Sequence, residues 1–149
     1  MAQDFSFLPR DKENFTRCFA CGKDNPIGLK LSFEWDGQFV RTEFTPTEPY
    51  QGWPGLAHGA IVMALLDEAM SWAAFYSGFC TVTGKLNAKL QKPARIGEPL
   101  SITGHITRAT RKLLETEASV TLHNGERVAW GEGTMFILDK NHFFKEKSS

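Results

Sequence analysis

The sequence has no apolar stretch long enough to cross a membrane and no recognisable secretion signal. Its longest apolar stretch, residues 60–75, is interrupted by Asp67, Glu68 and Ser71, whereas a spanning helix needs about 20 apolar residues. The first 15 residues lack a basic region followed by an apolar core and a small-residue cleavage site. We therefore expect a cytoplasmic protein that does not bind a membrane.

Cysteine is scarce, with three residues in the chain. An odd number cannot form a fully paired disulfide framework and suits a reducing compartment, where Cys80 would be a small apolar core residue. Cys18 and Cys21 form a Cys-x-x-Cys pair, but no second pair and no histidine at a recognised spacing completes a four-ligand metal site. We therefore favour a turn over a metal or redox site, and expect no metal.

The length and composition predict one globular domain. At 149 residues the chain has the size of a single domain. Hydrophobic residues make up 42% and charged residues 23%, which excludes a disordered chain or a collagen-like repeat. We expect one domain over residues 1–149, with an N-terminal extension at about 1–17 and a frayed polar tail at 139–149.

An alternating pattern predicts a β-hairpin early in the chain. Residues 30–35 and 38–44 alternate apolar and polar side chains on either side of Asp36-Gly37. The Asp-Gly dipeptide favours a tight two-residue turn, because glycine adopts positive φ without steric cost.

A loop and four further strands are predicted around a central helical segment. Three prolines and two glycines in residues 45–57 exclude regular structure, and we expect this loop to carry Tyr50 and Trp53 inward. Four β-like runs are separated by turn residues and are expected to form an antiparallel meander: residues 81–91, 100–109, 113–123 and 127–138.

The segment at about 59–76 predicts a long helix. Apolar residues cover almost its whole circumference, so we expect it to be buried nearly all round. The fold class is therefore α+β, a curved antiparallel sheet wrapped around one long central helix. Because one sheet covers only part of such a helix, a second subunit should cover the rest, in a homodimer or homotetramer.

Asp67 is the first candidate for catalysis. It lies in the middle of this helix, where apolar packing would otherwise be continuous, and such a carboxylate is a plausible general base at neutral pH. The alternative is that the Asp67-Glu68 pair only reaches a solvent-exposed seam. Of the two acids, Glu68 is expected to be the structural partner.

The start of the helix is a candidate oxyanion site. Backbone N–H groups at Gly59 or Ala60 lack partners within the helix and could donate to a carbonyl oxygen. Alternatively, Gly59 only relieves crowding and His58 only caps the helix. Asp67 follows His58 by nine residues, about 13 Å along the axis and on roughly the opposite face, so one helix cannot offer both to one carbonyl. A two-fold dimer would join them in two equivalent sites at the interface.

A basic segment suggests a phosphorylated ligand such as coenzyme A. Residues 85–112 contain seven basic residues and one acid, in a chain with no net charge at pH 7. Basic side chains near strand ends could bind phosphates from solvent. The alternative is a solvated strand face that prevents edge aggregation, and nucleic acid is not expected because no aromatic residues are interleaved. The candidate phosphate-binding residues are Lys85, Lys89, Arg95, Arg108, Arg111 and Lys112.

Three separate motifs resemble one family. HGAIVMALLD is similar to a motif that reads His-Gly-Gly with an aspartate nine residues after the histidine, and it aligns His58, Gly59, Ala60 and Asp67 with that motif. CFACGKDNPIGLKLSF and TGKLNAKLQKPARIGEPL resemble the opening and the segment after the helix. The chain thus resembles the hotdog-fold thioesterases of the 4-hydroxybenzoyl-CoA and phenylacetyl-CoA thioesterase superfamily.

The resemblance implies an acyl-CoA thioesterase with CoA as part of the substrate and no further cofactor. Asp67 would be general base or nucleophile, the partner's Gly59 N–H would polarise the thioester, and Thr83 would help to hold the attacking water. Gln51 stands where some relatives have an asparagine, and Ala60 replaces the second glycine. Aromatic residues including Trp53 would line the acyl pocket. The alternative function is non-catalytic acyl-CoA binding or sensing; a hydratase ranks lower, since no motif places a histidine for it.

Overall fold

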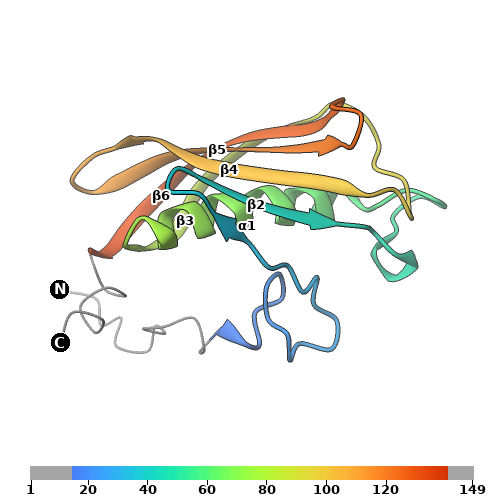
Figure 1. The fold of residues 1–149 in the computed structure, drawn as a ribbon, viewed down its shortest axis with the longest axis horizontal. Helices are drawn as coiled ribbons and strands as arrows, with labels where there is room; N and C mark the ends of the chain where they lie inside the picture. The colour runs from blue at the N-terminus through green and yellow to red at the C-terminus, as the bar shows by residue number, and fades with distance from the viewer. Residues whose placement is uncertain (1–14, 141–149) are drawn as a thin grey trace.

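The protein is an α+β structure in which one sheet lies over one long helix (Figure 1). The structure is a computed structural model that describes residues 15–140, with side chains described to residue 138. Most of the predicted extension and tail therefore falls outside the described residues. Within residues 15–140, no helix has the length and apolar character that crossing a membrane requires.

The predicted hairpin is present and consists of β1 (Glu34–Trp35) and β2 (Phe39–Phe44), paired antiparallel. Its turn is held by the side chain of Asp36, whose Oδ1 accepts hydrogen bonds from the N–H groups of Gln38 and Phe39 at 2.9 and 2.7 Å. Gly37 has a φ of +100°, a conformation that explains glycine at this position. The strands are shorter than predicted.

Helix α1 (Gly59–Tyr76) has the predicted bounds. It ends before Gly78, whose φ of +95° breaks the helical conformation. One face packs against β2 to β6, and seven residues of α1 are fully buried there and beside the N-terminal segment: Val62, Leu65, Leu66, Ala69, Met70, Ala73 and Ala74. Most other residues of the helix are only half-buried. The sheet of one chain thus covers one side of α1, and the burial nearly all round that we expect in an oligomer stays a prediction.

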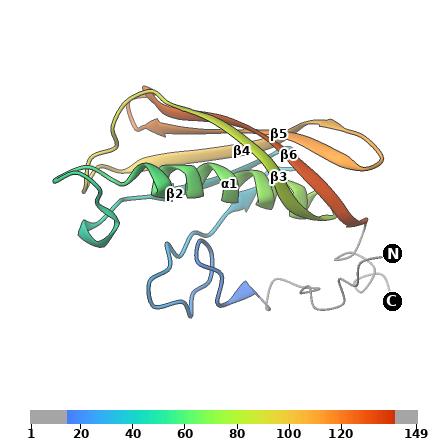
Figure 2. The ribbon, with the colours of Figure 1, turned by 180° about the vertical axis from the view of Figure 1, so that it is seen from behind.

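Over residues 15–140 the sheet contains six antiparallel strands in the order β1-β2-β4-β5-β6-β3. The strands after the helix are β3 (Phe79–Leu90), β4 (Leu100–Ala109), β5 (Leu113–Leu122) and β6 (Arg127–Lys140). The prediction of a four-strand meander holds for β4, β5 and β6 but is wrong for β3. Figure 2 shows β3 beside β6 at one edge of the sheet, while β4 pairs with β2. The connection over residues 91–99 is a long crossover rather than a hairpin turn, which allows this order.

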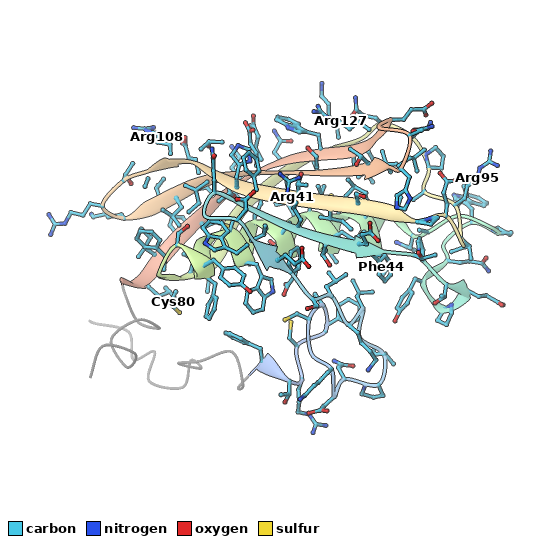
Figure 3. All side chains as sticks on the ribbon, in the orientation of Figure 1. Arg41, Phe44, Cys80, Arg95, Arg108 and Arg127 are labelled. Atoms are coloured by element: carbon cyan, nitrogen blue, oxygen red, sulfur yellow. The ribbon has the colours of Figure 1, made fainter. Side chains whose placement is uncertain are left out.

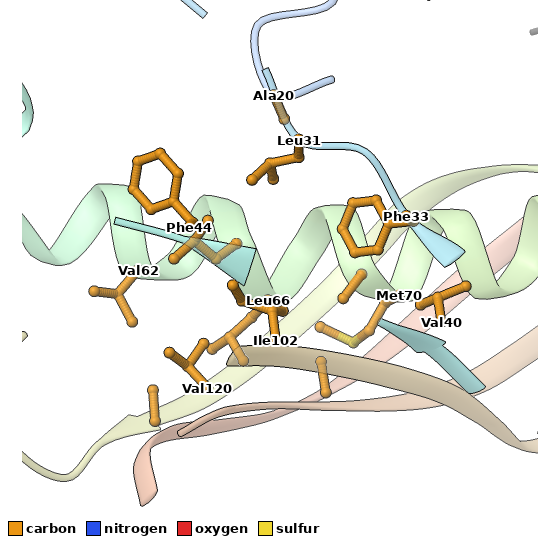
Figure 4. Close-up of a cluster of buried hydrophobic side chains, with 14 of the residues drawn as sticks. Ala20, Leu31, Phe33, Val40, Phe44, Val62, Leu66, Met70, Ile102 and Val120 are labelled. Atoms are coloured by element: carbon orange, nitrogen blue, oxygen red, sulfur yellow. The ribbon is translucent and has the colours of Figure 1, made fainter. Parts of the chain in front are cut away.

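The hydrophobic core lies on two sides of α1 (Figure 4). Ile102 and Val120, both fully buried, project from the sheet toward the helix. On the opposite side, the buried side chains of Ala20 and Leu31 belong to an irregular segment that crosses the helix. The N-terminal segment over residues 15–33 therefore packs onto the half of α1 that the sheet leaves open.

Candidate functional site

Asp67 and Thr83 form a hydrogen-bonded pair beside the edge strand. Asp67 is half-buried on α1 and Thr83 is exposed on β3, and Thr83 Oγ1 donates to Asp67 Oδ1 at 2.6 Å. The register of β3 against β6 shifts between Thr83 and Lys85. Such a bulge re-aims side chains, and a Cβ at the intervening Gly84 would overlap the ring of Phe136. Asp67, the predicted base or nucleophile, and Thr83, the residue predicted to hold the attacking water, are therefore in direct contact.

The start of α1 leaves one backbone donor available. His58 is the N-cap, and its Nδ1 accepts a hydrogen bond from the Ala60 N–H at 2.9 Å. This agrees with the interpretation of His58 as a cap and occupies the Ala60 donor. Within residues 15–140, the Gly59 N–H donates to no protein acceptor. Of the two backbone donors considered, Gly59 is the one that can serve a ligand.

A shallow hollow of about 510 Å³ surrounds this donor and brings several predicted residues together. Gln51 Oε1 accepts from the Gly55 N–H at 2.9 Å, so its amide oxygen is held by its own loop. Trp53 is 78% exposed, and the expectation that the loop carries it inward is wrong, because no part of the described chain covers the loop tip. The hollow is lined by Gln51, Gly52, Trp53, Ala57, His58 and Gly59.

Neither Asp67 nor Thr83 lines this hollow. The predicted catalytic residues thus form two groups in one chain, a carboxylate group (Asp67 and Thr83) and an oxyanion group (His58 and Gly59), and Gln51 lines the hollow of the second. This separation along α1 follows from the length of the helix between the two groups. A complete site requires a second chain or another arrangement of these groups.

The basic residues do not form one patch. Figure 3 shows Arg95 at one end of the molecule and Arg108 at the other. Arg108 lies 3.8 Å from Glu115, an ion pair between exposed side chains, and Arg111 and Lys112 belong to the same turn region. Arg95 lies near the oxyanion group, because it forms a β-bridge with Leu56. The sequence could not reveal this division, since it depends on the direction of β4.

A second cluster of reactive groups joins the Cys-x-x-Cys pair to the helix. Cys18 Sγ lies 3.8 Å from Glu68 Oε1, although 50 residues separate them in sequence. The hydrogen bond from the Cys21 side chain lowers the pKa of Cys18 to about 5, and the same bond together with burial raises the pKa of Cys21. Burial, followed by the charge of Cys18, raises the pKa of Glu68 to about 7. No sequence signal connects Glu68 with the cysteines.

Comparison with families and curated proteins gives one match. The family model described as the thioesterase superfamily matches residues 54–129, which include the start of α1, Asp67 and Thr83. Among curated proteins nothing matches.

Solved structures show the same fold. Zebrafish thioesterase superfamily member 2 is 24% identical, with a TM-score of 0.71, and the match covers 83% of this chain and 94% of that chain. The Escherichia coli PaaI protein, from the phenylacetic acid degradation operon, is 18% identical, with a TM-score of 0.69 and coverage of 72% and 83%. These likenesses, together with the sheet and helix described above, confirm the hotdog fold.

A hypothetical thioesterase from Streptococcus pneumoniae was solved with coenzyme A. It is 20% identical, with a TM-score of 0.70 and coverage of 74% and 87%. That protein was also solved as two variants, in which a threonine and an aspartate 16 residues before it are each replaced by alanine.

Proposed function

Because the chain belongs to the thioesterase superfamily, we propose that it hydrolyses acyl-CoA thioesters to a free acid and coenzyme A. The observation that carries this proposal is the hydrogen bond between Thr83 and the helical carboxylate of Asp67. The threonine and aspartate replaced in the S. pneumoniae protein are 16 residues apart, the same separation as Asp67 and Thr83, which supports the assignment. The coenzyme A bound to that protein supports the substrate class.

In the proposed reaction, Asp67 acts as general base or nucleophile. As a base it removes a proton from water held by Thr83, and the oxygen attacks the thioester carbonyl. The carbonyl oxygen then carries a negative charge, which the Gly59 N–H stabilises by a hydrogen bond. Collapse of this intermediate breaks the C–S bond, and the thiolate of coenzyme A leaves and takes up a proton.

The two groups of one chain would meet the complementary groups of a second chain. Strand β3 carries Thr83 in its first half and Leu90 at its end, and the nearest side-chain atom to a Cβ built on Gly59 is Leu90 Cδ1, at 3.3 Å. If β3 paired antiparallel with the β3 of a second chain, the Leu90 end of each strand would lie beside the Thr83 end of the other. The partner subunit's Gly59 would then approach Asp67.

We propose that some of the basic residues bind the phosphates of CoA. Arg95 is the strongest candidate, because its β-bridge with Leu56 places it near the oxyanion group. Exposed Trp53 lies in the same hollow and would cover the acyl or pantetheine chain. Lys85, Lys89, Arg108, Arg111 and Lys112 remain candidates that a second chain would have to bring into reach.

The test is release of free thiol from a panel of short-chain, medium-chain and aromatic acyl-CoAs. Asp67→Asn should lower kcat/KM by about 10²- to 10⁴-fold, because the base is lost without loss of volume. Gly59→Pro should lower it by about 10²- to 10³-fold, because proline removes the N–H and is tolerated at the first position of a helix. His58 already has the extended conformation that a following proline requires.

Gly59→Ala is the matched control, since it adds a Cβ but keeps the N–H, and it should retain most of the activity. Equal rates for wild type and Asp67→Asn would contradict the proposal. If acyl-CoA raises the Tm of the protein but neither the wild type nor any variant releases thiol, the protein is a non-catalytic acyl-CoA binder.

A further inference from the structure

The turn that contains Cys18 and Cys21 is built so that both sulfurs lie on one side. The Cys21 N–H donates to Cys18 Sγ at 3.5 Å, and the Gly22 N–H donates to the Cys18 carbonyl at 2.8 Å. A Cβ at Gly22 would overlap the backbone atoms of Cys18 and Thr16, so this turn requires glycine. A backbone N–H directed at sulfur favours the thiolate, which is the form that binds metals.

Helix α1 supplies a third ligand group to this turn. One ligand atom from each of Cys18, Cys21 and Glu68 lies within 4.8 Å of the other two. Around a tetrahedral zinc ion, with Zn–S near 2.3 Å and Zn–O near 2.1 Å, ligand atoms are about 3.5–3.8 Å apart. The Cys18 Sγ to Glu68 Oε1 distance of 3.8 Å already has this value. Small rotations of the side chains would place one ion between the three atoms.

The surroundings of Glu68 also favour a cation. Trp72 Nε1 donates to Glu68 Oε1 at 2.9 Å and orients the carboxylate, as hydrogen bonds from outer residues do around metal ligands. Among the residues that the structure describes, no lysine, arginine or histidine forms an ion pair with Glu68. Within residues 15–140, two thiols and a half-buried carboxylate therefore converge without an ion-pair partner of positive charge, an arrangement that a bound cation would stabilise.

We propose that Cys18, Cys21 and Glu68 bind one zinc-class divalent cation. Thiolates select such an ion over Mg²⁺ or Ca²⁺, which prefer oxygen ligands alone. Three protein ligands leave the fourth position of a tetrahedral ion for water or a ligand thiol. That position faces a cavity of about 200 Å³ whose walls include Phe15, Trp72 and Phe79. The ion would link the N-terminal segment to α1 at Glu68, the residue next to Asp67. Binding of the ion does not depend on thioester hydrolysis.

The experiment measures zinc in tag-free full-length protein purified without chelator from zinc-supplemented cells. We expect about one zinc per chain in wild type by mass spectrometry of the elements. Cys18→Ser, Cys21→Ser and Glu68→Gln should each lose most of it. Cys80→Ser is the matched control, because Cys80 lines the same cavity but its sulfur is not among the three clustered ligand atoms. Zinc-free wild type, or equal zinc in Cys18→Ser and Cys80→Ser, would overturn the proposal.

A second measurement covers variants that fail to fold. Metal-free wild type and Cys80→Ser are titrated with Co²⁺, and the absorption of cobalt–thiolate charge transfer is followed. We expect the absorption to saturate at one equivalent of Co²⁺ per chain and to disappear when Zn²⁺ displaces the cobalt. We also expect the bound metal to raise the Tm of the protein. Absence of this absorption in the reduced protein, or a Cys18–Cys21 disulfide that persists after zinc loading, would overturn the zinc site.

Discussion

The hydroxyl of Thr83 orients the carboxylate of Asp67. Asp67 is half-buried, and one of its oxygens accepts the short hydrogen bond from Thr83. Thr83 lies on an edge strand next to a register shift, and this position lets its hydroxyl hold the helical carboxylate by a hydrogen bond.

Thr83→Val should lower kcat/KM by about 10- to 100-fold, because a hydrogen bond to a charged group contributes about 1.5–3 kcal/mol. Thr83→Ser keeps the hydroxyl and should retain most of the activity. The measurement is steady-state thiol release with an acyl-CoA that wild type hydrolyses. A valine variant as active as the serine variant would remove Thr83 from the mechanism.

At the scale of elements, small residues allow α1 to approach the sheet closely. Gly104 on β4 pairs with Ala118 on β5, which pairs with Gly131 on β6. A Cβ at Gly104 would lie 2.8 Å from the carbonyl oxygen of Ala69, a backbone atom of the helix. This row of small side chains therefore sets the distance between α1 and the sheet, and with it the position of Asp67 relative to β3.

Gly104→Ala should lower the free energy of unfolding by about 1–3 kcal/mol, because the helix backbone must move away from the added methyl group. Gly131→Ala is the matched control at a second buried glycine, where the closest neighbour of the added Cβ would be Leu66 Cδ1, at 3.3 Å, and the Asn87 carbonyl oxygen and Ala88 Cβ would lie at ordinary contact distances of 3.5 and 3.6 Å. The loss of unfolding free energy in Gly131→Ala should be smaller, because the end of the Leu66 side chain can move away from the added methyl group. Urea unfolding of both variants tests this, and equal losses would contradict the close helix approach.

At the scale of the whole molecule, the proposed site needs two chains. In residues 15–140, β3 pairs with β6 alone, so its other edge is open, and the nearby side chains of Val82 and Leu90 are 44% and 47% exposed. An open edge with apolar neighbours favours pairing with a second chain. The carboxylate group and the oxyanion group are placed at opposite parts of this edge.

A mixed dimer of Asp67→Asn and Gly59→Pro chains separates a shared site from a single-chain site. In a two-fold dimer one site would carry both substitutions and the other neither, so the purified heterodimer should have about half the activity of the wild-type dimer. Each homodimer should be nearly inactive. The heterodimer is prepared with two different affinity tags and assayed by thiol release. Activity as low as in the homodimers would show that each chain uses its own residues.

Patterns local in sequence predicted much of the fold. The bounds of α1 and the Asp36-Gly37 turn were correct because helix periodicity and turn chemistry depend on neighbouring residues. The order of strands was partly wrong, because pairing is decided by the whole sheet. The motif led to Asp67 and Thr83, and the structure adds their hydrogen bond. Their catalytic roles stay a prediction.

The sequence by itself determined a long helix with a carboxylate at its centre and a histidine at its start that is either a cap or part of the site, since each feature lies within a few turns of one chain segment. Only the tertiary structure decided that Thr83 contacts Asp67, that β3 lies at the sheet edge, and that Glu68 reaches the cysteine turn. These contacts join residues distant in sequence, and packing of the helix between the sheet and the N-terminal segment brings them together.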